Sequence, residues 1–157
     1  MTSRGHLKFG AVLIAIMAVA AAAAPARADV TCSVVEIEAS TGTKPSVDGE
    51  LRQFEKRFKR PPYSSWNTFK RLGGTTATLA PQSESDVQLV HGKVGMLLRD
   101  VIERSGKRAR LSIGVTLDDS AGKRVVDTKI NVDAGDWFMW ARPMPGDKGH
   151  LVALSCK

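Results

Sequence analysis

Residues 109–132 of the chain read ARLSIGVTLDDSAGKRVVDTKINV. Every second residue of 109–117 is apolar, and a similar alternation returns over residues 126–132. Alternation with a period of two is typical of strands that have one face on a core and the other face in water. Residues 118–123 are mostly polar and predict the turn between the two strands. This stretch therefore predicts a β-hairpin, and the rest of the chain is interpreted around it.

Seven further segments carry short apolar runs between loops rich in Gly, Pro or polar residues. We expect strands at residues 30–39, 63–72, 75–80, 87–90, 94–102, 137–141 and 151–156. The alternation in the first of them shifts by one residue after Val34, which predicts a β-bulge, and Gly73-Gly74 predicts a turn between the next two. Short strands at hairpin spacing favour a mainly β fold, namely an antiparallel β-sandwich or small barrel of about eight strands.

One helix is expected, near the N-terminal end of this domain. Residues 47–60, VDGELRQFEKRFKR, have helical periodicity. At about 100° per residue, one side is apolar and the other is basic. The apolar side holds Val47, Leu51, Phe54 and Phe58, and the basic side holds Arg52, Lys56, Lys59 and Arg60. Pro61-Pro62 ends the helix, because proline has no N–H with which to continue it. The pattern predicts an amphipathic helix.

The first 28 residues have the pattern of a secretory signal peptide. Arg4 and Lys8 precede an uncharged run at 9–24, and residues 25–28, PARA, place small residues at the −3 and −1 positions of a cleavage site. The run is shorter than the roughly 20 apolar residues that a membrane-spanning helix needs. We expect a signal peptide at 1–28, a single domain at 29–157, and a periplasmic or secreted protein.

The charge of the expected mature chain is modest. The full chain carries a net charge of +7. Residues 1–28 contain three basic residues and no acid, so their removal leaves about +4. The chain also lacks a recognition-helix or RNA-binding signature, and we therefore expect no nucleic-acid partner.

The chain has two cysteines, Cys32 and Cys156, which stand near the two ends of the expected mature protein. An even count in an exported protein indicates a disulfide. The sequence has no Cys-x-x-Cys motif and no nearby histidine cluster that would indicate a redox or metal pair. We expect the bond to join the first strand to the last, with Cα atoms about 4.4–6.8 Å apart.

No catalytic motif is recognisable. The sequence has no serine-nucleophile elbow, no phosphate-binding glycine loop and no dinucleotide fingerprint. His91 and His150 each lie beside a glycine, and we interpret them as turn residues that no ligand spacing joins. Asp118 and Asp119 are interpreted as turn formers that bind their own backbone. The sequence therefore names no catalytic residue, metal ligand or cofactor, although catalytic groups need only be neighbours in space.

Two sets of residues are candidates for binding. The aromatic set is Trp66, Trp137 and Trp140, and the basic set is Arg52, Lys56, Arg57, Lys59 and Arg60. The tryptophans either are buried or expose an indole that stacks on a sugar ring, lipid chain or peptide. The cations either are a solvated surface or attract anionic envelope material, such as lipid head groups or acidic polysaccharide.

The chain also resembles a group of known proteins. Residues 61–66, PPYSSW, then Phe69-Lys70, the hairpins, and residues 149–154, GHLVAL, resemble small exported β-rich proteins of myxobacterial type. These proteins have no assigned activity. The resemblance implies the β-rich fold and the exported compartment, and it implies no site residue.

The sequence predicts a non-enzymatic exported β-domain that binds or organises an envelope component, with the helix and the aromatic strand after it as the contact surface. The alternative is a hydrolase of unrecognised type that acts on an envelope polymer. A cleft with converging histidine and carboxylate groups would favour the hydrolase, whereas a basic or aromatic patch without them would favour the binding protein.

Overall fold

The computed structural model describes residues 29–157. The predicted signal peptide at 1–28 lies outside the described residues. Within residues 29–157, no helix is long and apolar enough to cross a membrane.

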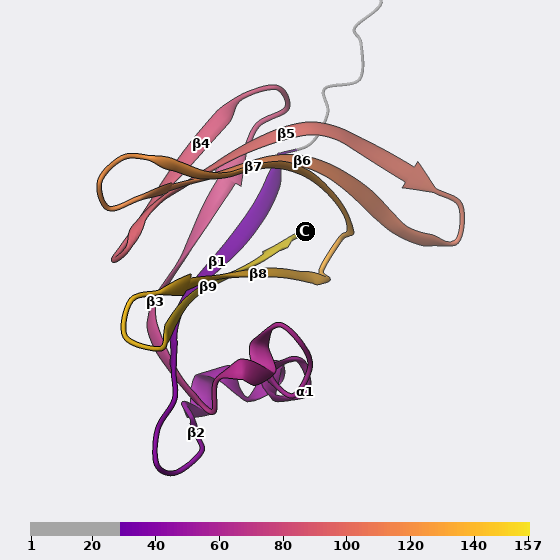
Figure 1. Ribbon diagram of the computed structural model, residues 1–157. Helices are drawn as coiled ribbons and strands as arrows, with labels where there is room; N and C mark the ends of the chain where they lie inside the picture. The colour runs from indigo at the N-terminus through magenta and orange to yellow at the C-terminus, as the bar shows by residue number, and fades with distance from the viewer. Residues whose placement is uncertain (1–28) are drawn as a thin grey trace, which may run out of the picture.

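The described chain is mainly β, as predicted (Figure 1). Its strands are β1 (Val30–Ser40), β2 (Ser46–Val47), β3 (Thr68–Leu79), β4 (Glu84–Leu89), β5 (Gly92–Arg104), β6 (Lys107–Asp119), β7 (Arg124–Asp133), β8 (Trp137–Met144) and β9 (Lys148–Cys156). Between β2 and β3 lies a helical segment, which consists of the 3-10 helix η1 (Gly49–Phe54), the α-helix α1 (Glu55–Phe58) and the 3-10 helix η2 (Tyr63–Ser65).

The strands form two sheets. The five-stranded sheet has the order β2-β3-β1-β9-β8, and the four-stranded sheet has the order β4-β5-β6-β7. Neighbouring strands run antiparallel, except that the two-residue β2 pairs with β3 in parallel. Figure 1 shows the four-stranded sheet and the helical segment on opposite sides of the five-stranded sheet. The five-stranded sheet is therefore a central layer.

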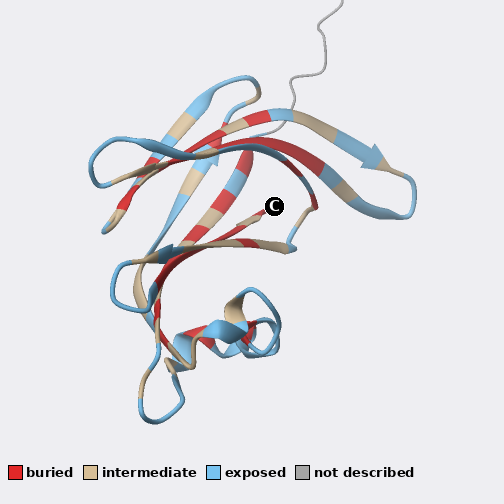
Figure 2. Cartoon of the chain, viewed as in Figure 1, coloured by how far each residue is buried: buried red, intermediate tan, exposed pale blue. Residues whose placement is uncertain are grey.

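This layering produces two apolar cores. The first core lies between the two sheets and includes Val34 of β1 and Ile113 of β6. The second lies between the five-stranded sheet and the helical segment, and it joins Ile37 and Leu151 to Phe54. Figure 2 shows the buried residues along β1 and β9 and on the inner side of the helical segment. Each fully buried side chain of this size contributes about 1.5–3 kcal/mol by leaving water.

The predicted bulge in the first strand is wrong. Val34 belongs to the first core, whereas Ile37 and Ala39 belong to the second, on the other face of the same strand. The alternation of β1 is regular, and the apparent shift arises because its two ends are covered on opposite faces. The irregularity lies in β3 instead, where the pairing with β1 skips Leu72.

Two further predictions about β3 are corrected. Gly73-Gly74 does not form a turn, because β3 continues through both glycines and pairs them with Glu36 and Val35 of β1. Residues 63–65 form η2 rather than the start of a strand. Long pairing with β1 outweighs the local tendency of a Gly-Gly pair to turn the chain.

The predicted helix is shorter and less regular than its periodicity indicated. Val47 lies in β2, residues 49–54 form a 3-10 helix, and the α-helical part covers four residues. The segment also follows β1 and β2, so it is an insertion before β3 rather than an N-terminal element. Its apolar side is confirmed, since Leu51, Phe54 and Phe58 are buried. So short a helix depends on tertiary packing, because an isolated helix of this length is not stable in water.

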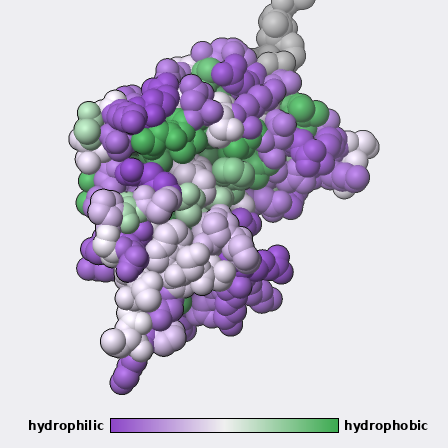
Figure 3. Space-filling model, in the orientation of Figure 1, coloured by the Kyte–Doolittle hydropathy of each residue, from purple (hydrophilic) through white to green (hydrophobic). Residues whose placement is uncertain are grey.

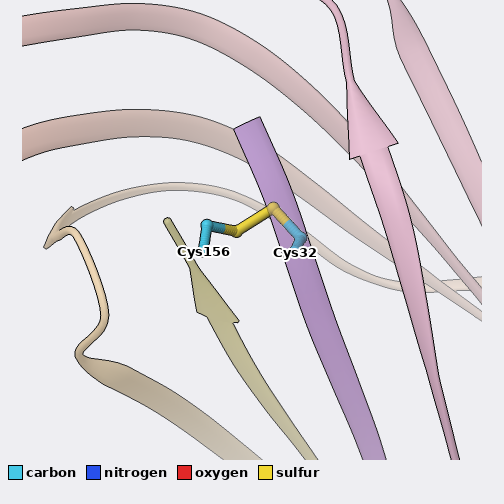
Figure 4. Close-up of a disulfide and its surroundings, with 2 residues drawn as sticks. All are labelled: Cys32 and Cys156. Carbon is cyan, nitrogen blue, oxygen red and sulfur yellow. A yellow bond between two sulfur atoms is a disulfide. The ribbon is translucent and has the colours of Figure 1, made fainter. Parts of the chain in front are cut away.

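Cys32 of β1 and Cys156 of β9 form the predicted disulfide (Figure 4). The two cysteines are directly opposite in the antiparallel register. Thr31 and Lys157 beside them exchange two backbone hydrogen bonds of 2.9 Å. The cysteines therefore occupy a non-hydrogen-bonded pair, where cross-strand side chains are closest. Their Cα atoms are 4.0 Å apart, just below the expected range.

Candidate functional site

The helical segment is fixed to the five-stranded sheet by aromatic contacts. The rings of Phe58 and Phe69 stack with their centroids 3.8 Å apart. Phe54 meets Trp137 of β8 edge to face at 5.0 Å. Aromatic pairs in such arrangements contribute about 0.5–1.5 kcal/mol beyond the area that they bury. These contacts hold the opposite, solvent-facing side of the segment in one position.

Polar contacts fix the two ends of the segment. At its start, the carboxylate of Asp48 accepts a hydrogen bond of 2.8 Å from the backbone N–H of Arg71. At its end, the Tyr63 hydroxyl donates to the backbone carbonyl of Met139 over 2.6 Å. Burial raises the pKa of Tyr63, although the charge of Arg57 acts in the opposite direction, so this hydroxyl remains a donor at neutral pH. The segment is thus a rigid platform.

The exposed side of this platform is basic. Its cations are Arg52, Lys56, Arg57, Lys59 and Arg60, and all five are exposed. None of them forms an ion pair with another residue of 29–157. Figure 3 shows hydrophilic side chains over the lower right of the molecule, where the helical segment lies, while hydrophobic ones gather higher, between the two sheets. We call these five residues the basic face.

Many cations on the sheets, unlike those of the basic face, form ion pairs within the described chain. Their ion pairs are Lys93 with Asp86, Arg104 and Arg110 with Asp133, Arg108 with Asp136, Arg124 with Asp118, and Lys148 with Glu38. Intramolecular pairing reduces the field that such cations present to an external anion. The cations of the basic face form no such ion pair within residues 29–157, so they can interact with an external partner without breaking one.

A groove of about 590 Å³ opens between the helical segment and the start of β3. Arg52, Glu55 and Lys59 line it from the helical segment, and Trp66 and Phe69 line it from the chain that follows. Small-molecule sites have volumes of about 300–1,000 Å³, so the groove has the size of a ligand site. Its charged groups are two cations and one carboxylate.

Trp66, which lines this groove, also lies against β9. A Cβ atom added at Gly149 of β9 would lie 2.5–2.7 Å from three consecutive atoms of the six-membered ring of Trp66. Nearly equal distances to three consecutive ring atoms mean that the face of the indole, and not its edge, covers Gly149. One face of the indole therefore rests on β9, and Trp66, which is half-buried, also lines the groove. Only glycine leaves room for this contact.

The structure brings some of the predicted binding residues together and separates others. Arg52, Lys59 and Trp66 line the groove, whereas the other three cations of the basic face lie outside it. Trp137 packs in the second core against Phe54 and borders a separate hollow of about 510 Å³. Trp140 lies on the other side of β8, against the first core. Both sides of β8 are thus largely covered, which is one of the two alternatives that its aromatic residues left open.

A buried polar network that the sequence interpretation missed lies between the sheets. His150 is fully buried in β9, so its interpretation as a turn residue is wrong. Its Nδ1 lies 3.2 Å from Nε of Arg142, and because a guanidinium can only donate, Nδ1 must accept this bond. Nε2 therefore carries the proton and donates to Oε1 of Glu36 over 2.8 Å. A signal was present in the sequence, because His150 stands within the apolar run of residues 149–154.

Glu36 is the centre of this network. Its carboxylate also accepts hydrogen bonds from the backbone N–H groups of Val90 (2.7 Å) and His91 (2.9 Å) in the turn between β4 and β5. Burial by itself would raise the pKa of Glu36, but the hydrogen bonds from His150 and from the two backbone groups outweigh burial and hold the pKa below its ordinary value. The network ties the four-stranded sheet to the central layer.

This histidine and carboxylate pair is not arranged for catalysis. Both ring nitrogens of His150 are used by Arg142 and Glu36, and the ring has no exposed surface. A general base needs a free nitrogen within reach of a substrate. His91 lies 3.9 Å from Glu38 at a partly exposed position and adds no third metal ligand. Within the described residues, no group of three or more potential ligands could hold a metal ion.

The two adjacent aspartates have structural roles. Asp119 accepts hydrogen bonds of 2.9 Å from the backbone N–H groups of Ala121 and Lys123, as its interpretation as a turn former predicts. The same interpretation is wrong for Asp118, which lies in β6 and pairs with Arg124 across the hairpin at 2.8 Å. The two carboxylates do not act as a pair.

No protein-family model, curated protein or solved structure matches the chain. The resemblance to small exported proteins of myxobacterial type therefore stays a prediction.

Proposed function

We propose that the protein is a non-enzymatic exported domain that binds an anionic component of the cell envelope through the basic face and the adjoining groove. Its fold is proposed to be an antiparallel β-sandwich, because the two sheets share the first core. Its location is proposed to be the periplasm or the extracellular medium. The disulfide supports this location, since such bonds persist in oxidising compartments.

One observation carries the proposal: five exposed cations that form no ion pair with another residue of 29–157 lie on a segment that is fixed to the protein by its buried side. Free cations on a rigid surface attract a polyanion without first breaking existing ion pairs, and their side chains do not need to be brought together by folding. The same segment borders a groove of ligand size, so attraction and specific contact can occur at one place.

The alternative function, hydrolysis of an envelope polymer, has less support. Glu55 is the carboxylate that lines the groove, and no histidine lines it. The histidine and carboxylate that do converge are buried elsewhere with their hydrogen-bonding capacity occupied.

The test is a charge reversal on the basic face. A variant with Lys56, Arg57, Lys59 and Arg60 replaced by Glu should lose capture by immobilised polygalacturonate and by phosphatidylglycerol vesicles. Near an anionic surface each cation contributes on the order of 1 kcal/mol, so capture should weaken by more than about a hundredfold. Capture of the wild type should also weaken as salt rises from about 0.15 M to about 1 M, because the screening length shrinks from about 8 Å to about 3 Å.

The matched control reverses four exposed cations that lie far along the chain from the helical segment, namely Lys107, Lys123, Lys129 and Lys157. It has the same net charge as the test variant and should retain most of the capture. Equal capture by the wild type and the test variant would show that the basic face is only a solvated surface. Equal loss in both variants would show that net charge, and not the basic face, controls binding.

A further inference from the structure

We infer that the groove is a subsite for one sugar unit that carries a carboxylate, within an acidic polysaccharide. This inference rests on the proposed function and narrows it from anions in general to uronic-acid polymers. It comes from the chemistry of the groove wall, which is lined by an indole, two cations and one carboxylate.

Trp66 supplies a stacking platform. One face of its ring rests on Gly149, so the ring is held in place without a ligand. In the proposed subsite, the opposite face of this half-buried, groove-lining side chain receives a flat apolar surface of the ligand. One side of a pyranose ring presents C–H groups and stacks on such a face, as other apolar groups do on aromatic rings. A platform fixed in advance loses little side-chain entropy when a ligand arrives.

The charged groups of the groove match the substituents of an acidic sugar. Arg52 offers a planar fork of donors and Lys59 offers a compact charge, and together they suit one carboxylate. Glu55 can accept hydrogen bonds from sugar hydroxyls. The same carboxylate would repel a ligand that is charged on every side, such as a polyphosphate. A ligand with one carboxylate and several hydroxyls satisfies all three side chains.

The groove is poorly suited to an acyl chain. Phe58 and Phe69 form its apolar floor, but they are 4% and 3% exposed, so their rings are already covered by protein contacts. The two rings therefore offer little surface to a lipid tail, and the charged groups of the groove would lose water beside one.

The rest of the basic face suits a polymer. Lys56, Arg57 and Arg60 lie on the same short helical stretch but outside the groove. A polysaccharide that places one unit in the groove can place the carboxylates of its neighbouring units near these cations. A polymer with a charge on every unit therefore fits both the groove and its surroundings.

The test is calorimetry of the disulfide-bonded protein with a trimer of galacturonic acid and with the matched neutral trimer of galactose. The acidic trimer should bind at least about tenfold more tightly, as expected for one charge-assisted contact. Trp66→Ala should weaken binding of the acidic trimer about three- to tenfold, and Trp66→Phe should recover part of the loss. Arg52→Gln should weaken binding of the acidic trimer and leave binding of the neutral trimer unchanged. Lys129→Gln, on β7, is the control for loss of one exposed cation.

The design separates this inference from the proposed function. A variant with Lys56, Arg57 and Arg60 replaced by Glu should lose capture by the long polymer while it retains stacking of the trimer on Trp66. The subsite is refuted if the wild type binds both trimers equally tightly. It is also refuted if Trp66→Ala and Arg52→Gln leave the affinity for the acidic trimer unchanged. Neither result contradicts capture of the long polymer by the basic face. Capture of phosphatidylglycerol vesicles without trimer binding would also refute it. Arg52→Gln changes an exposed side chain, so its result does not depend on whether Trp66→Ala folds.

Discussion

Replacing Glu36 by Gln should destabilise the protein strongly, although the two side chains have nearly the same shape. Oε1 of Glu36 accepts hydrogen bonds from His91 and His150, and Oε2 accepts one from Val90. A glutamine has a single carbonyl oxygen, so its NH₂ group must face at least one of these N–H donors. His150 cannot relieve the conflict by moving its proton to Nδ1, because Nδ1 accepts the bond from Arg142.

The expected cost follows from the burial of these groups. Glu36 is 2% exposed, so water cannot replace a lost partner. A hydrogen bond to a charged group contributes about 1.5–3 kcal/mol, and a buried donor left without a partner costs about 1–3 kcal/mol. We expect Glu36→Gln to lower the free energy of unfolding by about 2–4 kcal/mol.

The assay is urea unfolding at about pH 7, followed by tryptophan fluorescence with the disulfide intact. Glu38→Gln is the matched control, because Glu38 also lies on β1 but is 23% exposed and pairs with Lys148 at 3.2 Å. A partly exposed pair of this kind contributes about 1 kcal/mol or less. Equal losses of stability in the two variants would show that the buried hydrogen bonds of Glu36 do not stabilise the fold.

The same carboxylate predicts how stability depends on pH. The pKa of Glu36 is lowered from its ordinary value of 4.5 in the folded protein. Its contribution is therefore fully present above the unfolded-state pKa and is lost as the pH falls through the folded-state pKa. Wild-type stability should decline below about pH 4.5, and Glu36→Gln should lack this part of the decline. If Glu36→Gln shows the same decline of stability with pH as the wild type, Glu36 does not contribute to that decline.

Three other predictions concern the cysteines, the second core and the mature N-terminus. Replacing Cys32 and Cys156 by Ala should lower the free energy of unfolding by about 4–5 kcal/mol, because the bond closes a loop of 124 residues, and urea unfolding measures the loss. Phe58→Asp should unfold the domain, since it places a charge against Phe69 at a position that is 4% exposed; native-like circular dichroism and melting would contradict this. N-terminal sequencing of the exported protein should begin at Asp29, and recovery of an intact residue 1–28 segment would reject the predicted cleavage.

The sequence predicted well those features that depend on neighbouring residues. Residues 109–132 form β6, a turn and β7, because a period of two follows directly from the backbone geometry of a strand. The buried side chains of Leu51, Phe54 and Phe58 were predictable from their helical spacing, although the length and type of the helix were not.

The predictions from local sequence patterns were wrong where contacts between the layers of the fold decided the structure. The shift of apolar residues along β1 indicated a bulge, but it arises because the two ends of the strand bury opposite faces. Gly73-Gly74 has the local signature of a turn, but β3 continues through it because both residues pair with β1. In each case a contact with a distant strand decided the outcome.

By itself, the sequence determined the mainly β character and the presence of a basic, aromatic segment before β3. It also determined the disulfide, because two cysteines allow only one intramolecular pairing. Only the tertiary structure decided that Trp66 rests on Gly149 and lines a groove with Arg52 and Lys59, and that a buried network forms across the strands. The physical reason is that backbone geometry sets the periodicity of a strand or helix within a few residues. Contacts between residues far apart in the chain depend on strand register and on which layer covers each face.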